Sequence, residues 1–208
     1  MGGCMNLMLR RRAMMGIAGD DIVLPDGFTR LQYIYNQSNA YIDTGVLLTS
    51  SDTIDTQWEE LTSQGGDRMV CGIRPSAFSV NLYYGVTKPH MSWGESGGFS
   101  LSSPDQRVRV ERGMFYGYNG GAVSIVVDKT SFSYAATKPL YLFCWNNGNN
   151  APQYPLKQTG IKYFTIEGKW NGIPCTDPNN VVGMYDVVNG NFHTSPNGTA
   201  FIAGPLYE

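Results

Sequence analysis

The acidic stretch between residues 52 and 60 comes closest to a catalytic arrangement in this sequence. General acid–base chemistry on a glycosidic bond needs two carboxylates about 5–10 Å apart. The stretch contains Asp52, Asp55, Glu59 and Glu60, and in an extended strand Asp55 and Glu59 lie on the same face. No acidic side chain occupies the position between them, which is Gln57. We therefore interpret these acids as solvated charges on a strand and predict no catalytic residues.

Metal-ligating residues are sparse and scattered along the chain. His90 and His193 are the only histidines, and neither has an acidic neighbour at ligand spacing. The four cysteines form no Cys-x-x-Cys pair that would predict a zinc site; they are Cys4, Cys71, Cys144 and Cys175. Calcium bound through loop oxygens is the remaining alternative, but no dense cluster of aspartates supports it. We expect neither a metal nor another cofactor.

The positions of the cysteines favour burial over reactivity. Cys71 and Cys144 lie within apolar runs, where a free cysteine behaves as a small hydrophobic residue. Cysteines that stay reduced fit a protein assembled in a reducing cytoplasm. A disulfide between Cys144 and Cys175 is the alternative.

Tryptophan beside asparagine predicts a candidate sugar site. Sugar sites combine an aromatic plate with amide or carboxylate hydrogen bonds, and Trp145 is followed by Asn146, Asn147 and Asn149. Trp93, in a glycine-rich segment, is a second candidate plate. The alternative for Trp145 is core packing at the end of a buried strand. For the asparagines it is ordinary turn chemistry.

Residues 181–205 indicate the class of fold that positions these side chains. Val182 begins a strand, Asn189-Gly190 forms a tight turn that accepts positive φ, and the chain returns through Phe192. A last short strand follows at Phe201. A hairpin cannot bury its apolar face alone, so this segment must close a larger sheet.

The rest of the chain repeats a pattern of short strands separated by turns. Gln106–Arg112 alternates strictly, with Val108 and Val110 on one face. Pro139–Trp145 is a nearly continuous apolar run and predicts one central strand buried on both faces, whereas Gly168–Asn180 predicts an irregular connection. Twelve or more short strands at this spacing predict an all-β fold, an antiparallel two-sheet β-sandwich of the jelly-roll type.

Length and charge limit the classes of function. The chain has 208 residues, of which 42% are hydrophobic, enough for one β domain that we place at residues 23–208. The net charge of −2 argues against nucleic-acid binding, which requires a basic face. No run approaches the ~18 apolar residues of a membrane span. We expect neither nucleic acid nor a membrane as a partner.

Residues 1–22 differ from the domain that follows them. They contain the only run of charge, Arg10, Arg11 and Arg12, beside apolar residues that include Leu7 and Leu9. The apolar segment after the arginines is too short for a signal peptide. We predict an N-terminal arm with a helix too short to be stable alone, which anchors the protein to a neighbouring subunit through these residues. A disordered tail is the alternative.

Two blocks of sequence together carry a family resemblance. The first spans Leu24–Ile34 and Ala40–Gly45; the second comprises Ile161–Phe164, Ile173–Cys175, Val182–Asp186, Asn189-Gly190 and Phe201–Pro205. In these blocks the chain resembles the laminin-G-like, concanavalin-A-like jelly-roll proteins that recur in bacteriophages and prophages of gut bacteria. One departure is visible: these proteins commonly carry Arg-Asp-Phe before Ile-Pro-Cys, and Trp170-Asn171-Gly172 stands there in this chain.

The resemblance implies a virion protein, made in the bacterial host cytoplasm and displayed on the head or tail of a phage particle. It would be structural and non-enzymatic, with other virion proteins and further copies of itself, for example in a trimer, as partners. Glycans of the host or of mucus are its candidate ligands. Two alternatives stay open. Concanavalin-A-like sandwiches include glycoside hydrolases, which here would use Asp55 and Glu59, and a bacterial cell-surface adhesin is the other.

Deletion of residues 1–22 tests the arm. We expect the truncated chain to unfold at the temperature of the full chain, because the sandwich folds without the arm, and to lose incorporation into its assembly. Calorimetry and sedimentation measure the two properties. Unchanged incorporation together with an unchanged oligomer would contradict an anchoring role. A collapse of the unfolding transition would instead place the arm on its own sandwich.

Overall fold

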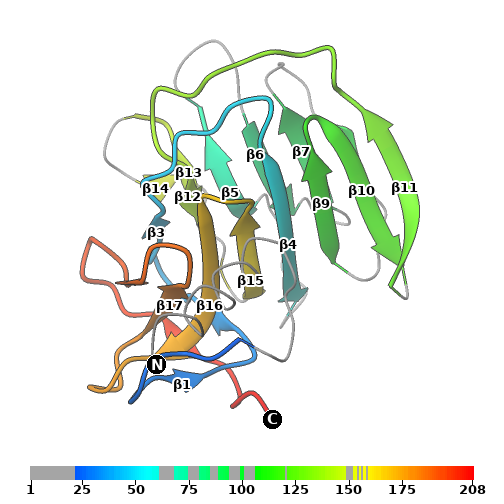
Figure 1. The fold of residues 1–208 in the computed structure, drawn as a ribbon. Helices are drawn as coiled ribbons and strands as arrows, with labels where there is room; N and C mark the ends of the chain where they lie inside the picture. The colour runs from blue at the N-terminus through cyan, green and yellow to red at the C-terminus, as the bar shows by residue number, and fades with distance from the viewer. Residues whose placement is uncertain are drawn as a thin grey trace, which may run out of the picture.

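The computed structural model describes residues 22–60, 68–74, 80–84, 89–93, 99–100, 106–119, 121–148, 152–153, 155, 157 and 159–208. In these ranges the chain forms nineteen short strands in two sheets and no helix (Figure 1). The predicted all-β, antiparallel two-sheet β-sandwich is thereby confirmed, while its jelly-roll type stays a prediction. The predicted arm, with Leu7, Leu9 and Arg10 to Arg12, lies outside the described residues. None of the elements in these ranges is a helix of the length and apolarity needed to cross a membrane.

The larger sheet contains eleven of the described strands and forms the face toward the viewer in Figure 1. Its main path runs, in spatial order, β11 (Ala122–Asp128), β10 (Met114–Asn119), β9 (Arg107–Glu111), β4 (Thr53–Glu60), β15 (Thr159–Ile166), β16 (Trp170–Thr176), β17 (Val182–Asp186) and β18 (Asn191–His193). Three short strands extend it: β1 (Thr29–Arg30) pairs with β16, and β2 (Ile34–Tyr35) pairs with β15 and β19 (Ile202–Ala203).

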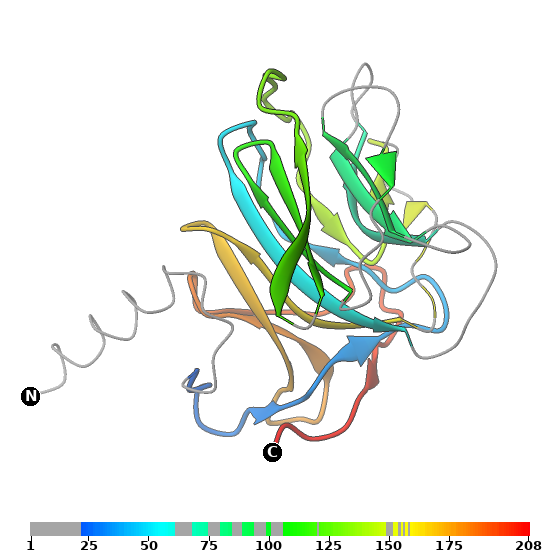
Figure 2. The same ribbon diagram turned by 90° about the vertical axis from the view of Figure 1, so that its right-hand side faces the viewer.

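The smaller sheet contains the other eight described strands. Its path is β14 (Pro152–Gln153), β13 (Trp145–Asn146), β5 (Arg68–Ile73), β6 (Val80–Tyr84), β7 (Pro89–Trp93) and β8 (Phe99–Ser100), with β12 (Tyr141–Leu142) bridging β5 and β3 (Ile42–Asp43). Among its named strands, β13 and β5 form the one parallel pair. Seen from the side, the two sheets face each other as separate layers (Figure 2).

Strict alternation of side chains places the core between the layers. In β9, Val108 and Val110 are buried while Arg107 and Arg109 point to the outer face, as the sequence predicts. Burying each large apolar side chain contributes about 1.5–3 kcal/mol. The largest fully buried side chains are Trp58, Trp93, Trp170, Phe115, Phe143 and Phe164.

The prediction of a single strand over Pro139–Trp145 is wrong. The run forms two short strands, β12 and β13, which pair with β5 in opposite directions. Between them Phe143 has a φ of 65°, a left-handed conformation that interrupts the strand. Its amide donates to the Val70 carbonyl at 2.8 Å, and its buried ring packs on Phe201 with centroids 4.9 Å apart. Burial of a large aromatic ring offsets the cost of this backbone conformation.

The expectation of an irregular connection over Gly168–Asn180 is also wrong. β16 occupies most of it, paired with β15 and β1 on one edge and β17 on the other. Gly172 is required there because the indole of Trp170 lies against its Cα, so that a Cβ would overlap the six-membered ring. The glycine therefore serves close packing within a strand.

The predicted hairpin forms from β17 and β18. The turn between them comprises residues 187–190, and within it Gly190, but not Asn189, takes a positive φ, of 74°. Asp186, at the end of β17, organises the turn: one carboxylate oxygen accepts from the amides of Asn171 and Val188, each at 3.0 Å. This buried carboxylate thus joins the hairpin to the neighbouring strand.

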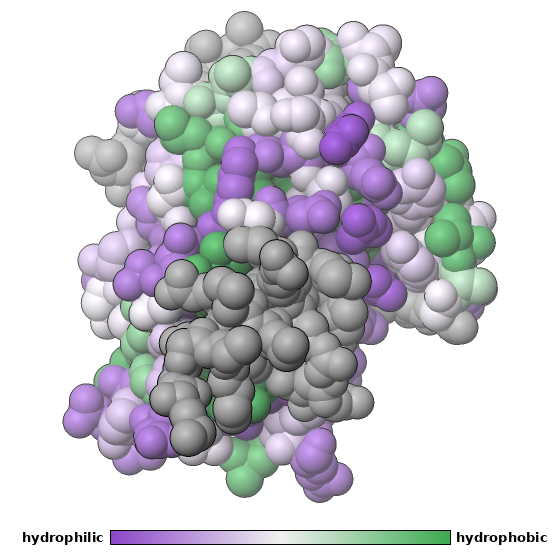
Figure 3. Space-filling model, viewed as in Figure 1, coloured by the Kyte–Doolittle hydropathy of each residue, from purple (hydrophilic) through white to green (hydrophobic). Residues whose placement is uncertain are grey.

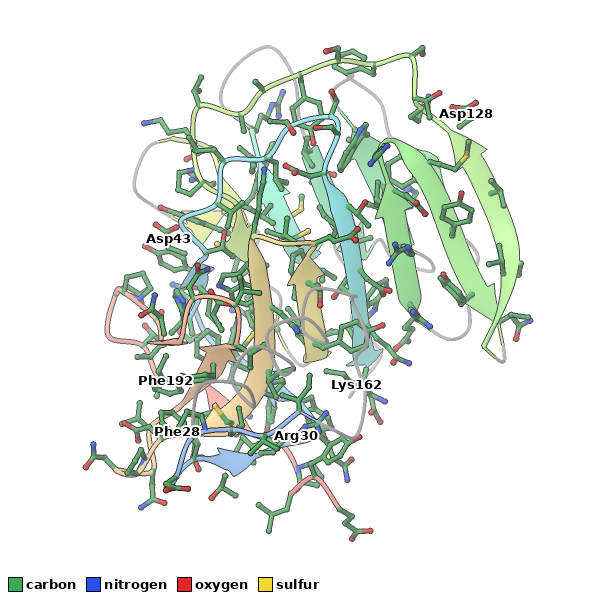
Figure 4. All side chains as sticks on the ribbon, in the orientation of Figure 1. Phe28, Arg30, Asp43, Asp128, Lys162 and Phe192 are labelled. Carbon is green, nitrogen blue, oxygen red and sulfur yellow. The ribbon has the colours of Figure 1, made fainter. Side chains whose placement is uncertain are left out.

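An aromatic cluster holds this hairpin against the start of the domain. The ring of Phe28 meets Tyr185 and Phe192 edge-on, with centroids 5.1 and 5.5 Å apart, and Figure 4 shows Phe28 and Phe192 side by side. Together with the pairing of β19 to β2, the cluster brings the two ends of the domain into one part of the sheet.

The described cysteines are free and buried. Cys71 and Cys144 behave as the small hydrophobic residues that the sequence predicts, and Cys144 forms no disulfide with Cys175. Burial raises the pKa of Cys71 and that of Cys175 to about 12. Both thiols are therefore protonated at neutral pH.

Replacing Gly172 by alanine tests the packing of Trp170. We expect Gly172→Ala to lower the free energy of unfolding by about 1–3 kcal/mol, the usual cost of overpacking. Trp170→Phe removes the overlapping ring atoms, so the double variant should lose less than the sum of the two single losses. Urea unfolding of the four proteins measures this coupling. Strictly additive losses would contradict the proposed overlap.

Candidate binding site

Trp93 lies in the core and not at the surface. Its side chain is 1% exposed, and its ring meets Phe115 and Tyr134 edge-on, with centroids 5.6 and 5.3 Å apart. A sugar stacks on the exposed face of an aromatic ring. In this position Trp93 offers no such face.

Trp145 is also largely buried, with 8% of its surface exposed. The guanidinium of Arg74 lies over its ring, 4.9 Å from the centroid. Gly72 of β5 passes so close that a Cβ there would lie 2.9 Å from the indole. The surroundings of Trp145 therefore correspond to the core-packing alternative.

The asparagines after Trp145 do not gather into one exposed cluster. The Asn146 side chain is buried, donating to the Pro139 carbonyl at 2.8 Å and accepting from the Gly148 amide at 3.0 Å. This is turn chemistry. Asn147 is partly buried, and Asn149 lies outside the described residues.

Asp55 and Glu59 lie on the outer face of the larger sheet, and each acid of residues 52–60 whose side chain the structure describes has a cationic partner. Asp52 pairs with Lys169 at 2.8 Å, and Glu59 pairs with Lys162 at 2.9 Å. Hydrophilic side chains gather on this face over β4 and β9 (Figure 3).

The interpretation of these acids as solvated charges is wrong for Asp55, the most deeply buried charge of this face, with 2% of its surface exposed. Arg107 binds it in a bidentate manner, with Nε and Nη2 3.2 and 2.9 Å from the two carboxylate oxygens. The Tyr163 hydroxyl donates to the same carboxylate at 2.9 Å, and Arg109 lies 3.6 Å away. Four polar side chains from three adjacent strands thus form one network.

Within the network, Tyr163 and Arg107 keep their protons near neutral pH. Burial, reinforced by the Asp55 charge, raises the pKa of Tyr163 well above its ordinary value. The hydrogen bond with Asp55 raises the pKa of Arg107. Tyr163 therefore remains a hydroxyl donor and Arg107 a cation near neutral pH. This arrangement is suited to stabilising the three strands and to holding fixed charges on the outer face.

A pocket of about 300 Å³ opens on the same outer face, beside the Asp55 network. Its polar lining combines cations, amides and phenols. The lining residues are Arg30, Gln32, Gln57, Lys162, Tyr163, Ile173, Tyr207 and Glu208. Arg30 of β1 and Lys162 of β15 lie near each other in Figure 4. None of these residues belongs to the predicted sugar site.

Tyr207 and Glu208 form one side of the pocket, and hydrogen bonds of the preceding residues hold them there. Gln32 donates through its amide to Pro205 and through its side chain to Leu206, at 2.9 and 3.1 Å. The Tyr207 amide donates to the Arg30 carbonyl at 3.2 Å. These bonds fasten the segment at residues 205–207 along β1 and bring Tyr207 beside Arg30.

The guanidinium of Arg30 lies on the ring of Tyr207, 3.6 Å from its centroid. Such stacking fixes the plane of the guanidinium and leaves its in-plane N–H groups at the rim of the ring. Among the described residues Arg30 makes no ion pair, and Tyr207 is 38% exposed. Nothing in the sequence near Arg30 marks it, because its stacking partner is far away in the chain.

The fold and the pocket define this chain as a β-sandwich protein with a polar pocket on its larger sheet. No model of a known protein family matches the chain, and no curated protein is detectably similar to it in sequence. In the described part of the chain, no group of three or more histidine, cysteine or acidic side chains could hold a metal ion.

Replacing Asp55 and Glu59 separately tests their different environments. We expect Asp55→Asn to lower the free energy of unfolding by about 2–3 kcal/mol, because it breaks a buried charged network. Glu59→Gln is the matched control: the Glu59 and Lys162 side chains are 44% and 35% exposed, so its loss should stay below about 1 kcal/mol. Denaturant unfolding measures both. Equal losses would show that Asp55 has no special structural role.

Proposed function

We propose that this protein is a non-enzymatic component of a bacteriophage particle, displayed on its head or tail, and that its sandwich binds glycans of the host or of mucus. The stacked Arg30–Tyr207 pair at the pocket carries the glycan-binding part of this proposal. The binding surface is the pocket, in place of the region around Trp145.

The chemistry of the pocket lining suits a sugar. Arg30, Gln32 and Gln57 bring planar hydrogen-bonding groups to one small cavity, and neighbouring sugar hydroxyls both donate and accept hydrogen bonds. Tyr207 adds an aromatic ring that is partly exposed at the same cavity. A volume near 300 Å³ is at the small end of ligand pockets, which fits one sugar residue at the end of a chain.

The acids of β4 support binding without turnover. A glycoside hydrolase needs one carboxylic acid that donates a proton and a second carboxylate that attacks or activates water. Asp55 is enclosed by Arg107 and Tyr163, and Glu59 is paired with Lys162. Neither is arranged as a proton donor toward the pocket.

The phage assignment is supported by the blocks that carry the family resemblance. In the fold these blocks are joined: β1 pairs with β16, and β2 pairs with β15 and β19. The two blocks therefore form one structural unit. On a particle, many weak sites presented together bind a polyvalent surface far more tightly than one site does.

A glycan array probed with the full chain tests the binding function. We expect binding to at least one class of bacterial or mucin glycan, and at least about a tenfold loss in Tyr207→Ala. Tyr116→Ala is the matched control, since Tyr116 lies on β10, in another part of the same sheet. Absence of binding to every glycan, or equal losses in both variants, would contradict the proposal.

Two further measurements separate the alternatives. Chromatography of incubated polysaccharides should show no products; products that disappear in Asp55→Asn or Glu59→Gln would establish a hydrolase instead. Mass spectrometry should find the protein in purified phage particles. Its recovery from a bacterial envelope, with no phage gene beside its own, would favour an adhesin.

A further inference from the structure

We infer that the pocket selects an acidic sugar, a hexuronate whose carboxylate is bound by Arg30. This inference rests on the proposed glycan-binding function and adds the chemical class of the ligand. It comes from the distribution of charge around the pocket.

Arg30 differs from the other cations on this face. Arg107 and Arg109 both approach Asp55, and Lys162 pairs with Glu59. Arg30, in contrast, contacts the Tyr207 ring and has no carboxylate partner within the described ranges. A guanidinium held in a cavity without forming an ion pair is suited to bind an anion from outside.

The orientation of Arg30 favours a planar anion. The guanidinium carbon of Arg30 lies 3.6 Å from the centroid of the Tyr207 ring, and the N–H groups of a guanidinium lie in one plane. A carboxylate accepts two parallel hydrogen bonds from such a fork. The Arg30 backbone is fixed as well, through pairing with Cys175 in β16.

The other charges at the pocket limit the ligand to a single negative charge. Lys162 lines the cavity, but it shares its charge with Glu59 at 2.9 Å. Glu208 is a carboxylate in the same lining and opposes any anion. With Lys162 paired to Glu59 and Glu208 opposing an anion, Arg30 is the one lining cation left for a ligand, which fits a monovalent carboxylate better than a phosphate dianion.

The amide side chains of the pocket are available to form hydrogen bonds with the sugar ring. Gln32 uses one N–H for the Leu206 carbonyl, and a glutamine side chain has a second N–H and a carbonyl oxygen. Gln57 lines the pocket from β4. A ring that carries both hydroxyls and one carboxylate uses all of these groups.

Matched oligosaccharides test the inference. The probes are one oligosaccharide ending in glucuronate, the same one ending in glucose, and its 6-sulfated and 6-phosphorylated forms, each titrated into the full chain by calorimetry. We expect the glucuronate form to bind at least about tenfold more tightly than the glucose form. This preference should shrink as salt is raised, because the pair is partly exposed.

Three variants locate the effect. Arg30→Gln should remove the preference for glucuronate while leaving weak binding of the glucose form. Glu208→Gln should strengthen glucuronate binding about two- to fivefold, since it removes an opposing charge. Arg112→Gln, at an exposed arginine in the β9–β10 turn, should change nothing. Thermal unfolding of each variant verifies that the fold is retained. If Arg30→Gln loosens the segment at residues 205–207, the expected gain in glucuronate binding by Glu208→Gln still tests the inference.

The outcomes separate this inference from the proposed function. Equal affinity for the glucose and glucuronate forms, or a preference that survives Arg30→Gln, overturns the inference and leaves glycan binding intact. Tighter binding of the sulfated or phosphorylated form overturns the choice of a carboxylate. Failure to bind any glycan, here and on the array, overturns the proposed function itself.

Discussion

The alternation of side chains along β4 separates the core of this protein from its polar face, and much of the structure depends on it. Ile54 and Trp58 enter the core, whereas Asp55 lies between them on the outer face. A shift of one residue would exchange the two sets and bury Asp55 among apolar side chains. The network with Arg107 and Tyr163 therefore fixes the register of β9, β4 and β15. The same register places Gln57 and Lys162 at the pocket.

Local patterns predict the parts of the fold in which local forces dominate. The alternation of β9 and the Asn189-Gly190 turn are such cases, because pleat and turn geometry act over a few residues. The patterns fail where distant partners decide. Phe143 adopts a left-handed φ between two short strands because its ring packs in the core, and Gly172 lies in a strand because Trp170 covers it.

Local sequence patterns do not predict the pocket, for a similar reason. Its lining comes from β1, Gln32, β4, β15, β16 and residues 207–208, which only the sheet brings together. A tryptophan next to asparagines is a visible pattern, but a buried ring beside a turn produces it as readily as a sugar site does. The family resemblance includes Arg30 within a longer block, yet it indicates a fold and not a ligand. Arg30 is distinguished by its stacking on Tyr207 and by the lack of an ion pair in the described structure.

The buried thiols give the domain a covalent structure that is independent of its redox surroundings. Oxidation of cysteine proceeds through the thiolate and requires access. Cys71, Cys144 and Cys175 are all enclosed, and burial keeps Cys71 and Cys175 protonated at neutral pH. A sandwich built in a reducing compartment would thus keep the same bonds after release into an oxidising one. Its stability rests on packing and hydrogen bonds on both sides of that transition, with no cross-link to gain or lose among these three residues.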